Sequence, residues 1–273
     1  MSAEATTSKE PRPEPGSTKP DAILVADGVR RAFGGLVAVN VEHVEFQRGV
    51  ITALIGPNGA GKTTFFNVLT GFEHRDRGTW QLEGHPVAGL PPHRIAQRGM
   101  VRTFQLTKAL ARMTVLDNMK LAATRQRGEH FLAALVPPAW RPQEVAIEAR
   151  ALGLLEHFQL SRLRDHYAGT LSGGQRKLLE VARALMVEPA LLMLDEPMAG
   201  VNPALKQSLL GHITELRDQG TTVVFVEHDM DVVTEISDWI VCMAEGEVIA
   251  EGRPSAIVAN DAVIDAYLGR RHG

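Results

Sequence analysis

The feature of this chain that most constrains its fold is the stretch GPNGAGKTT at residues 56–64. It fits the pattern G-x-x-x-x-G-K-[ST] without a mismatch, follows the apolar run VITALI at 50–55, and opens a segment predicted to be helical from about Lys62. A buried strand, a glycine-rich loop and a helix in this order predict a phosphate-binding loop. The alternative is a glycine-rich strand-to-helix turn with a surface lysine, which does not require the complete pattern.

The residue types of this loop indicate its chemistry. Its glycines allow backbone N–H groups to turn inward around phosphates, and the amino end of the helix adds a favourable dipole. We expect Lys62 to reach the β- and γ-phosphates of a nucleotide and the Thr63 hydroxyl to ligate Mg²⁺. The predicted nucleotide-binding residues of the loop are Gly56, Pro57, Asn58, Gly59, Ala60, Gly61, Lys62, Thr63 and Thr64.

A pair of adjacent carboxylates supplies the other groups that nucleotide hydrolysis requires. In LLMLDEP at 191–197, four apolar residues place Asp195 at the carboxyl end of a predicted buried strand, where ligands gather in open α/β sheets. Asp195 is a candidate for the metal shell, and Glu196 is a candidate general base. Either carboxylate alone is also compatible with a helix cap or a solvated surface group.

Composition narrows the function classes further. Of the 273 residues 44% are hydrophobic, enough for one large domain or a main domain with a subdomain. With 29 basic and 32 acidic residues the net charge is −3, so the overall electrostatic field of the chain does not favour nucleic acid as a partner.

The single cysteine, Cys242, lies in the apolar run WIVCMA and is predicted to be a buried small hydrophobe. No secretory signal or long apolar span is evident, and the chain is predicted to be cytosolic.

The sequence predicts a tail, a core and a helical insertion. Residues 1–20 contain four prolines and few large apolar side chains, so we expect a disordered tail there and one domain over 21–273. An antiparallel piece is predicted from Ile23, followed by a strand near TWQLEG. The stretch from about 90 to 170 has helical spacing and no strand-like run, which predicts an inserted helical subdomain. Within it, the prolines of 124–142 favour an irregular excursion.

Beyond residue 175 the predicted elements alternate between helix and strand. A helix is expected through KLLEVARALM, and another is expected after Asn202 as cap with Pro203 in its first turn. Apolar runs between and after them predict the strands ALLMLD, TTVVFV, WIVCMA and EVIAEG. This alternation favours a parallel sheet with helices on its faces.

A second glycine-rich stretch, LSGGQ at 171–175, follows the first loop and precedes LLMLDEP. In this combination the chain resembles the ATP-binding cassette (ABC) ATPases from about Ile23 to its carboxyl end. The resemblance implies an α/β fold: a P-loop NTPase of the ABC type with an antiparallel β subdomain and an inserted α-helical subdomain. It also implies ATP and Mg²⁺ as ligands.

The resemblance implies roles for several further residues. Phe33 resembles the aromatic residue that stacks on adenine, and Gln105 in RTFQ resembles a glutamine that contacts Mg²⁺, supports catalysis and couples the site to the membrane partner. His228 resembles the switch histidine that touches the γ-phosphate. Asn202 stands where many family members have an aspartate. This difference puts in doubt how the attacking water is positioned across the interface between two paired cassettes. The catalytic set is therefore expected to be Glu196, His228 and Gln105, and the metal set Thr63, Gln105 and Asp195.

The same resemblance explains why one chain carries two glycine-rich loops. In these ATPases the second loop caps the ATP held by another subunit, so two cassettes close around two nucleotides. We therefore expect a second ABC ATPase subunit, identical or different, as a partner. The residues expected to contact its nucleotide are Ser172, Gly173, Gly174 and Gln175.

A narrower resemblance concerns the transported substrate. FGGLVAVN at 33–40, VRTFQ at 101–105, AGVNP, VEHDM at 226–230 and the closing YLG look like the ATP-binding subunit of branched-chain amino acid importers. This implies transmembrane permease subunits, indirectly a substrate-binding protein, and a peripheral place on the cytoplasmic side of the inner membrane. Urea or amide importers and the lipopolysaccharide-export ATPase share part of these features.

Functions outside transport are alternatives. A translation or DNA-repair cassette usually has two cassettes in one chain or a coiled-coil insertion, and this chain has neither heptads nor a basic stripe. A P-loop kinase does not require LSGGQ. A purely regulatory nucleotide-binding module is expected to lack the pair Glu196 and His228, which is present here.

Overall fold

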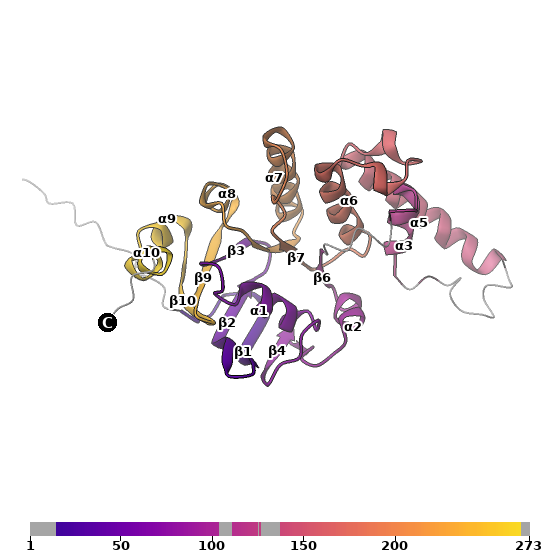
Figure 1. Cartoon of the computed structure of the whole chain (residues 1–273). Helices are drawn as coiled ribbons and strands as arrows, with labels where there is room; N and C mark the ends of the chain where they lie inside the picture. Colours follow the sequence, from indigo (N-terminus) through magenta and orange to yellow (C-terminus); the bar gives the residue numbers. More distant parts are fainter. Residues whose placement is uncertain (1–14, 104–110, 125, 127–136, 269–273) are drawn as a thin grey trace, which may run out of the picture.

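The computed structural model describes residues 15–103, 111–124, 126 and 137–268. Within these residues the strands form a six-stranded sheet in the order β10-β9-β3-β8-β7-β6 and a four-stranded sheet in the order β2-β1-β4-β5. Figure 1 shows α3, α5 and α6 gathered on one side of the molecule and α9 and α10 on the opposite side. None of the helices in the described ranges is long and apolar enough to cross a membrane.

The six-stranded sheet carries the nucleotide-binding elements. β3 (Ile51–Ile55) pairs in parallel with both β8 (Thr222–Val226) and β9 (Trp239–Ala244), and β7 (Leu191–Asp195) pairs in parallel with β8. β10 (Glu247–Gly252) is an antiparallel edge strand beside β9. Every residue of β3 and β8 is buried, as expected of a parallel sheet covered on both faces. The predicted strands and their mainly parallel pairing are confirmed.

The two faces of this sheet contribute to two different hydrophobic cores. Ile51, Ala53 and Ile55 pack into the core beneath α6 (Gly173–Leu185), α7 (Pro203–Asp218), α8 (Met230–Ile236) and α9 (Pro254–Val258), whereas Leu54 faces the other core. Such alternation follows from the two-residue period of a strand. The sheet is therefore the wall between a helical layer and the layer that contains α1.

The second core joins α1 (Lys62–Leu69) to the antiparallel sheet. That sheet consists of β1 (Ala22–Phe33), β2 (Leu36–Gln47), β4 (Arg77–Leu82) and β5 (His85–Pro86), so the predicted antiparallel piece is confirmed. Its largest buried side chains are aromatic and come from both elements, namely Phe46, Phe65, Phe66 and Trp80. Burial of such side chains stabilises a fold by about 1.5–3 kcal/mol each. This packing fixes the helix that follows the first glycine-rich loop.

The expectation that no strand lies between 90 and 170 was wrong. α2 (Pro92–Gln97) leads into β6 (Met100–Arg102), which pairs in parallel with β7 at the edge of the main sheet. Three residues are too few to display a strand period, and the strand exists because β7 offers an unpaired edge. The boundaries of the helical subdomain at 90 and 170 stay a prediction.

Among the described residues that follow β6, the first helix is α3 (Val115–Ala122), whose cap Thr114 accepts a hydrogen bond from the Asp117 backbone N–H. α5 (Pro137–His157) starts inside the stretch expected to be irregular, so that expectation was wrong for its last six residues. Prolines fit the first turn of a helix because its N–H groups have no partner within the helix, and Pro142 inside α5 removes only one bond. α10 (Asp261–Leu268) ends the described chain.

The expectation of a disordered tail over 1–20 was wrong for residues 15–20. Ser17 donates through its backbone N–H and its hydroxyl to Glu251, and Lys19 Nζ donates to the other oxygen of the same carboxylate at 2.8 Å. The Trp239 indole N–H donates to that oxygen at 3.0 Å, and Lys19 Nζ lies 4.2 Å from the Trp239 ring centroid. The Glu251 side chain is fully buried and requires such partners, which composition alone does not reveal. Residues 1–14 lie outside the described residues.

Candidate functional site

The loop at 56–64 connects β3 to α1, as the motif requires, and α1 begins at Lys62 as predicted. Glycine is obligatory at two of its positions. Gly56 has φ +145°, and a Cβ there would lie 2.0 Å from the Met243 carbonyl oxygen. Gly61 has φ +92°, and a Cβ there would lie 2.2 Å from the Ala38 carbonyl oxygen. The loop is therefore packed closely against the end of β9 at Gly56 and against β2 at Gly61, and only glycine fits at these two positions.

Lys62 is the buried cation of this loop. Its Nζ donates to the carbonyl oxygens of Gly56 at 2.7 Å and Pro57 at 3.0 Å. Burial lowers the pKa of Lys62, and the nearby carboxylate of Glu196 opposes that effect. The ammonium group is thus held over the loop by weak neutral acceptors, which an anionic phosphate can replace.

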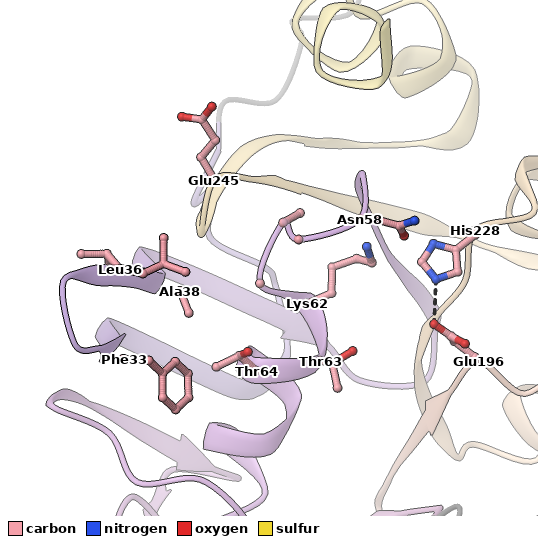
Figure 2. A pocket seen from close by; sticks show the side chains of 14 residues that line it. Phe33, Leu36, Ala38, Asn58, Lys62, Thr63, Thr64, Glu196, His228 and Glu245 are labelled. Atoms are coloured by element: carbon pink, nitrogen blue, oxygen red, sulfur yellow. Dashed lines mark hydrogen bonds and ion pairs between the residues drawn. The ribbon is translucent and has the colours of Figure 1, made fainter. Parts of the chain in front are cut away.

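A cavity of about 770 Å³ opens beside the loop. Its volume falls within the range of about 300–1,000 Å³ that is typical of small-molecule sites. Figure 2 shows Phe33 at one end of the cavity, Glu196 and His228 at the other, and Lys62 between them. The other labelled lining residues in the figure are Leu36, Ala38, Asn58, Thr63, Thr64 and Glu245.

Phe33 has the properties of an aromatic platform at this cavity. Its side chain is exposed to 45%, and the Arg31 guanidinium lies 4.4 Å from the ring centroid. Arg31 is itself held by ion pairs to Glu73 and Asp76. An exposed ring fixed from one side offers its other surface to a flat base. Its predicted contact with adenine stays a prediction.

Glu196 and His228 meet at the mouth of the cavity. His228 Nε2 lies 2.7 Å from Glu196 Oε1, and the dashed line in Figure 2 marks this hydrogen bond. Glu196 has φ +46°, a left-handed conformation that is uncommon for a residue other than glycine, and its N–H donates to Val226 O at the end of β8. The ends of β7 and β8 therefore bring together two side chains that are 32 residues apart in the sequence.

The loop at 171–175 lies apart from this cavity. None of its residues lines the cavity, and Ser172 and Gly173 are exposed. Ser172 caps α6: its hydroxyl accepts from the Gln175 N–H, and the Gln175 side chain accepts from the Ser172 N–H. Gly174 is packed so tightly that a Cβ would lie 1.9 Å from Leu205 Cδ2 on α7. The result is a rigid helix amino end whose tip faces solvent.

Comparisons with known proteins agree with this geometry. The model of the family described as "ABC transporter" matches residues 39–199, and the model described as "Branched-chain amino acid ATP-binding cassette transporter" matches residues 247–273. A protein of Archaeoglobus fulgidus named "Probable branched-chain amino acid transport ATP-binding protein LivG" is 44% identical, over 90% of this chain and 95% of the relative.

The BraF protein of Pseudomonas aeruginosa, named as a high-affinity branched-chain amino acid transport ATP-binding protein, is 43% identical over 90% of this chain and 98% of its own. A solved nucleotide-free ATP-binding cassette from an ABC transporter superposes with a TM-score of 0.78 at 36% identity, covering 90% of this chain and 98% of that one.

The chain belongs to the ABC transporter family. It is therefore an ATP-binding chain that hydrolyses ATP in connection with transport. The predicted P-loop fold is confirmed at the level of the family. The predicted roles of individual residues stay predictions, and Gln105 lies outside the described residues.

The structure adds residues to the ABC transporter site that the sequence patterns did not indicate. Arg102, at the end of β6, donates to the Asp195 carboxylate and to the Asn67 side chain on α1. The side chains of Arg102 and Asp195 are exposed to only 8% and 16%. Arg102 stands three positions before Gln105, within VRTFQ, and that motif was its only sequence signal.

Glu227 is a second addition, beside the residue expected to be the switch histidine. Its carboxylate is buried and accepts from the backbone N–H groups of His228 and Met198, both at 3.0 Å.

Tyr267 is the third residue that the structure adds. Its hydroxyl accepts a hydrogen bond from the Gly56 N–H at 2.9 Å, although the two residues are 211 positions apart in the sequence. Burial raises the pKa of the Tyr267 hydroxyl, which keeps it neutral.

Proposed function

We propose that this chain is the ATP-hydrolysing subunit of an importer of branched-chain amino acids. The observation that carries the enzymatic part is the hydrogen bond of 2.7 Å between Glu196 and His228 at the mouth of the P-loop cavity. The proposed substrate is supported by the names of the relatives and by the match of the carboxyl-terminal family model to residues 247–273. Both rest on the family to which the chain belongs.

ATP binds with its phosphates in the loop and its base beside Phe33. The loop N–H groups and the Lys62 ammonium bind the β- and γ-phosphates. The Thr63 hydroxyl and the Asp195 carboxylate offer hard oxygen donors of the kind that Mg²⁺ prefers, and Gln105 completes the predicted set. Mg²⁺, when bound, neutralises charge on the phosphates.

Hydrolysis then depends on Glu196. Its carboxylate accepts a proton from the attacking water as the water oxygen bonds to the γ-phosphorus. The bond between the γ-phosphorus and the bridging oxygen of ADP breaks, and the products are ADP and phosphate. His228, which is hydrogen-bonded to Glu196, holds that side chain in place and contacts the γ-phosphate in the proposed mechanism. Buried Glu227 fixes the His228 backbone, so the pair is positioned by a rigid strand end.

The exposed loop at 171–175 supplies the cap for a nucleotide on a second ATPase subunit, identical or different. Ser172 and Gly173 are exposed at its tip, at the amino end of α6, a helix of 13 residues. Asn202 caps α7 and accepts from the Leu205 N–H, so it retains the capping function of an aspartate without the charge. The positions of these groups outside the cavity support a shared site.

The transport part of the proposal requires partners. Transmembrane permease subunits receive the motion of the ATPase dimer, and a substrate-binding protein delivers the amino acid. The chain acts as a peripheral subunit on the cytoplasmic side of the inner membrane. Nucleic acid is not a proposed partner, because the charges of the chain nearly balance.

Uptake of labelled leucine and labelled urea tests the proposal in a strain that lacks this chain. Loss of leucine uptake alone, restored by the wild-type chain and not by Glu196→Gln, supports a branched-chain amino acid importer powered at this site. Loss of urea uptake with intact leucine uptake supports the urea importer instead. Intact uptake of both overturns the proposed substrate class.

A further inference from the structure

A group of titratable side chains outside the nucleotide cavity joins α5 to α7. His157 is the last residue of α5, and His212 and Glu215 lie three residues apart on α7. His157 Nε2 lies 3.4 Å from Glu215 Oε2, and His212 Nδ1 lies 3.6 Å from the same oxygen. One ligand atom from each residue lies within 4.8 Å of the other two. None of the three residues lines the nucleotide cavity.

These distances suit a tetrahedral metal ion. Zinc binds nitrogen and oxygen ligands at about 2.0–2.1 Å, which places the ligand atoms of a tetrahedron about 3.3 Å from one another. Two of the three separations are already close to that value, and the third, which is within 4.8 Å, shortens when the partly exposed His157 side chain moves toward His212. Glu215 and His157 are exposed to 56% and 31%, so an ion can enter from solvent.

The buried histidine of the group has an unpartnered ring nitrogen. The His212 side chain is about nine-tenths buried. Among the described residues its buried Nδ1 has no hydrogen-bond partner, although it is aimed at Glu215. Its Nε2 lies 3.4 Å from the Ser208 hydroxyl, which can accept the ring N–H and leave the lone pair on Nδ1. A hydrogen bond at the other ring nitrogen is characteristic of metal-ligating histidines.

An unpaired, buried ring nitrogen is costly unless a partner satisfies it. Phe158 packs on the rings of both histidines, which excludes water from one side of the group. We propose that His157, His212 and Glu215 bind a divalent transition-metal ion, with Zn²⁺ as the ion that two imidazoles and one carboxylate suit best and water as the fourth ligand. The bound ion ties α5, which packs against α6, to α7 of the ATPase core.

Zinc titration of the tag-free, metal-free full chain against a chromophoric chelator tests the site. The wild-type chain is expected to bind one Zn²⁺, and zinc is expected to raise its Tm because the ion binds the folded chain. His157→Ala and Glu215→Gln, both at exposed or partly exposed positions, are expected to weaken zinc binding more than about tenfold. Loss of a residue that only hydrogen-bonds a metal ligand already lowers metal affinity by at least about tenfold. His85→Ala, at an exposed histidine on β5, is the matched control and is expected to bind like the wild type.

The proposal is overturned if the wild-type chain does not compete with the chelator, or if His157→Ala and Glu215→Gln bind zinc as tightly as the wild type. An equal loss in His85→Ala would also overturn it, because the ion would then bind surface histidines without regard to this cluster. His212→Ala leaves a cavity near Phe158, so its folding is checked by circular dichroism. If the His212→Ala chain is folded, its zinc affinity is also expected to fall more than about tenfold.

Discussion

The glycine-rich loop at 56–64 is enclosed by its own chain, whereas the loop at 171–175 faces solvent. A Cβ at Gly56 would meet the Met243 backbone, and the Gly56 N–H is bound by Tyr267 from the carboxyl end. At Gly173 the nearest atom to a Cβ would lie 3.9 Å away. The first loop is therefore one wall of a pocket that this chain builds for itself. The second is a capped helix end with an exposed tip, open to a ligand that another molecule holds.

Glu196→Gln tests the chemistry of the enclosed loop and carries the largest expected effect. We expect ATP turnover to fall about 100- to 10,000-fold because the general base is lost, while ATP binding persists because Lys62 and the loop are unchanged. Phosphate release and binding of a fluorescent nucleotide measure the two. Glu245→Gln, at the other glutamate that lines the cavity, is the control and should keep its turnover. Unchanged hydrolysis in Glu196→Gln would remove this residue from the role of base.

Gly56→Ala and Gly173→Ala compare the two loops directly. At Gly56 an alanine requires a φ near +145° and displaces backbone, so we expect a loss of about 1–3 kcal/mol or more in the free energy of unfolding. At Gly173, the first residue of α6, alanine is a better helix former and its Cβ would make only an ordinary van der Waals contact, so stability should stay within about 0.5 kcal/mol. Urea unfolding measures both. Equal losses would mean that the second loop is as enclosed as the first.

The residues with strong local signals were predicted from the sequence. The strand before Gly56, the helix from Lys62, the position of Asp195 at a strand end and the Asn202 cap all depend on neighbours in the sequence or on a strand period, and all were found. The contact between Glu196 and His228 follows from the parallel pairing of β7 and β8, because the carboxyl ends of parallel strands share one edge of the sheet.

Contacts between distant residues were not predictable in this way. Arg102 reaches Asp195 across 93 residues, Tyr267 reaches Gly56 across 211, and Ser17 reaches Glu251 across 234. Each depends on the order of strands in the sheet and on which side chains the folded layers bring together. β6 was missed for the same reason, since its three residues form a strand only beside β7.

Arg102→Ala tests whether such a distant contact supports the enclosed loop. Its loss removes the cation that is hydrogen-bonded to the largely buried Asp195 carboxylate, so we expect about 1–3 kcal/mol lower stability by urea unfolding. Arg94→Ala, at an exposed arginine of α2, is the control and should not change stability measurably. Equal stability of Arg102→Ala and the wild type would show that the ion pair is not needed to hold β6, β7 and α1 together.

Tyr267→Phe has the smallest expected effect. It removes the acceptor of the Gly56 N–H while it keeps the ring, and we expect a loss of about 0.5–1.5 kcal/mol in stability. Tyr167→Phe, at the other tyrosine of the chain and near the exposed loop, is the matched control because that side chain is exposed to 59%. Differential scanning calorimetry compares the two variants. A loss in Tyr167→Phe as large as that in Tyr267→Phe would contradict the contrast between the loops.

The central claim is that the exposed loop completes a nucleotide site on another subunit. Light scattering of the Glu196→Gln chain, alone and mixed with the second ATPase of its transport system, tests it most directly. We predict that ATP shifts the measured mass from one chain to two, and that adding Ser172→Arg abolishes the shift while ATP still binds. A mass that stays that of a single chain in both samples when ATP is fully bound would contradict the claim.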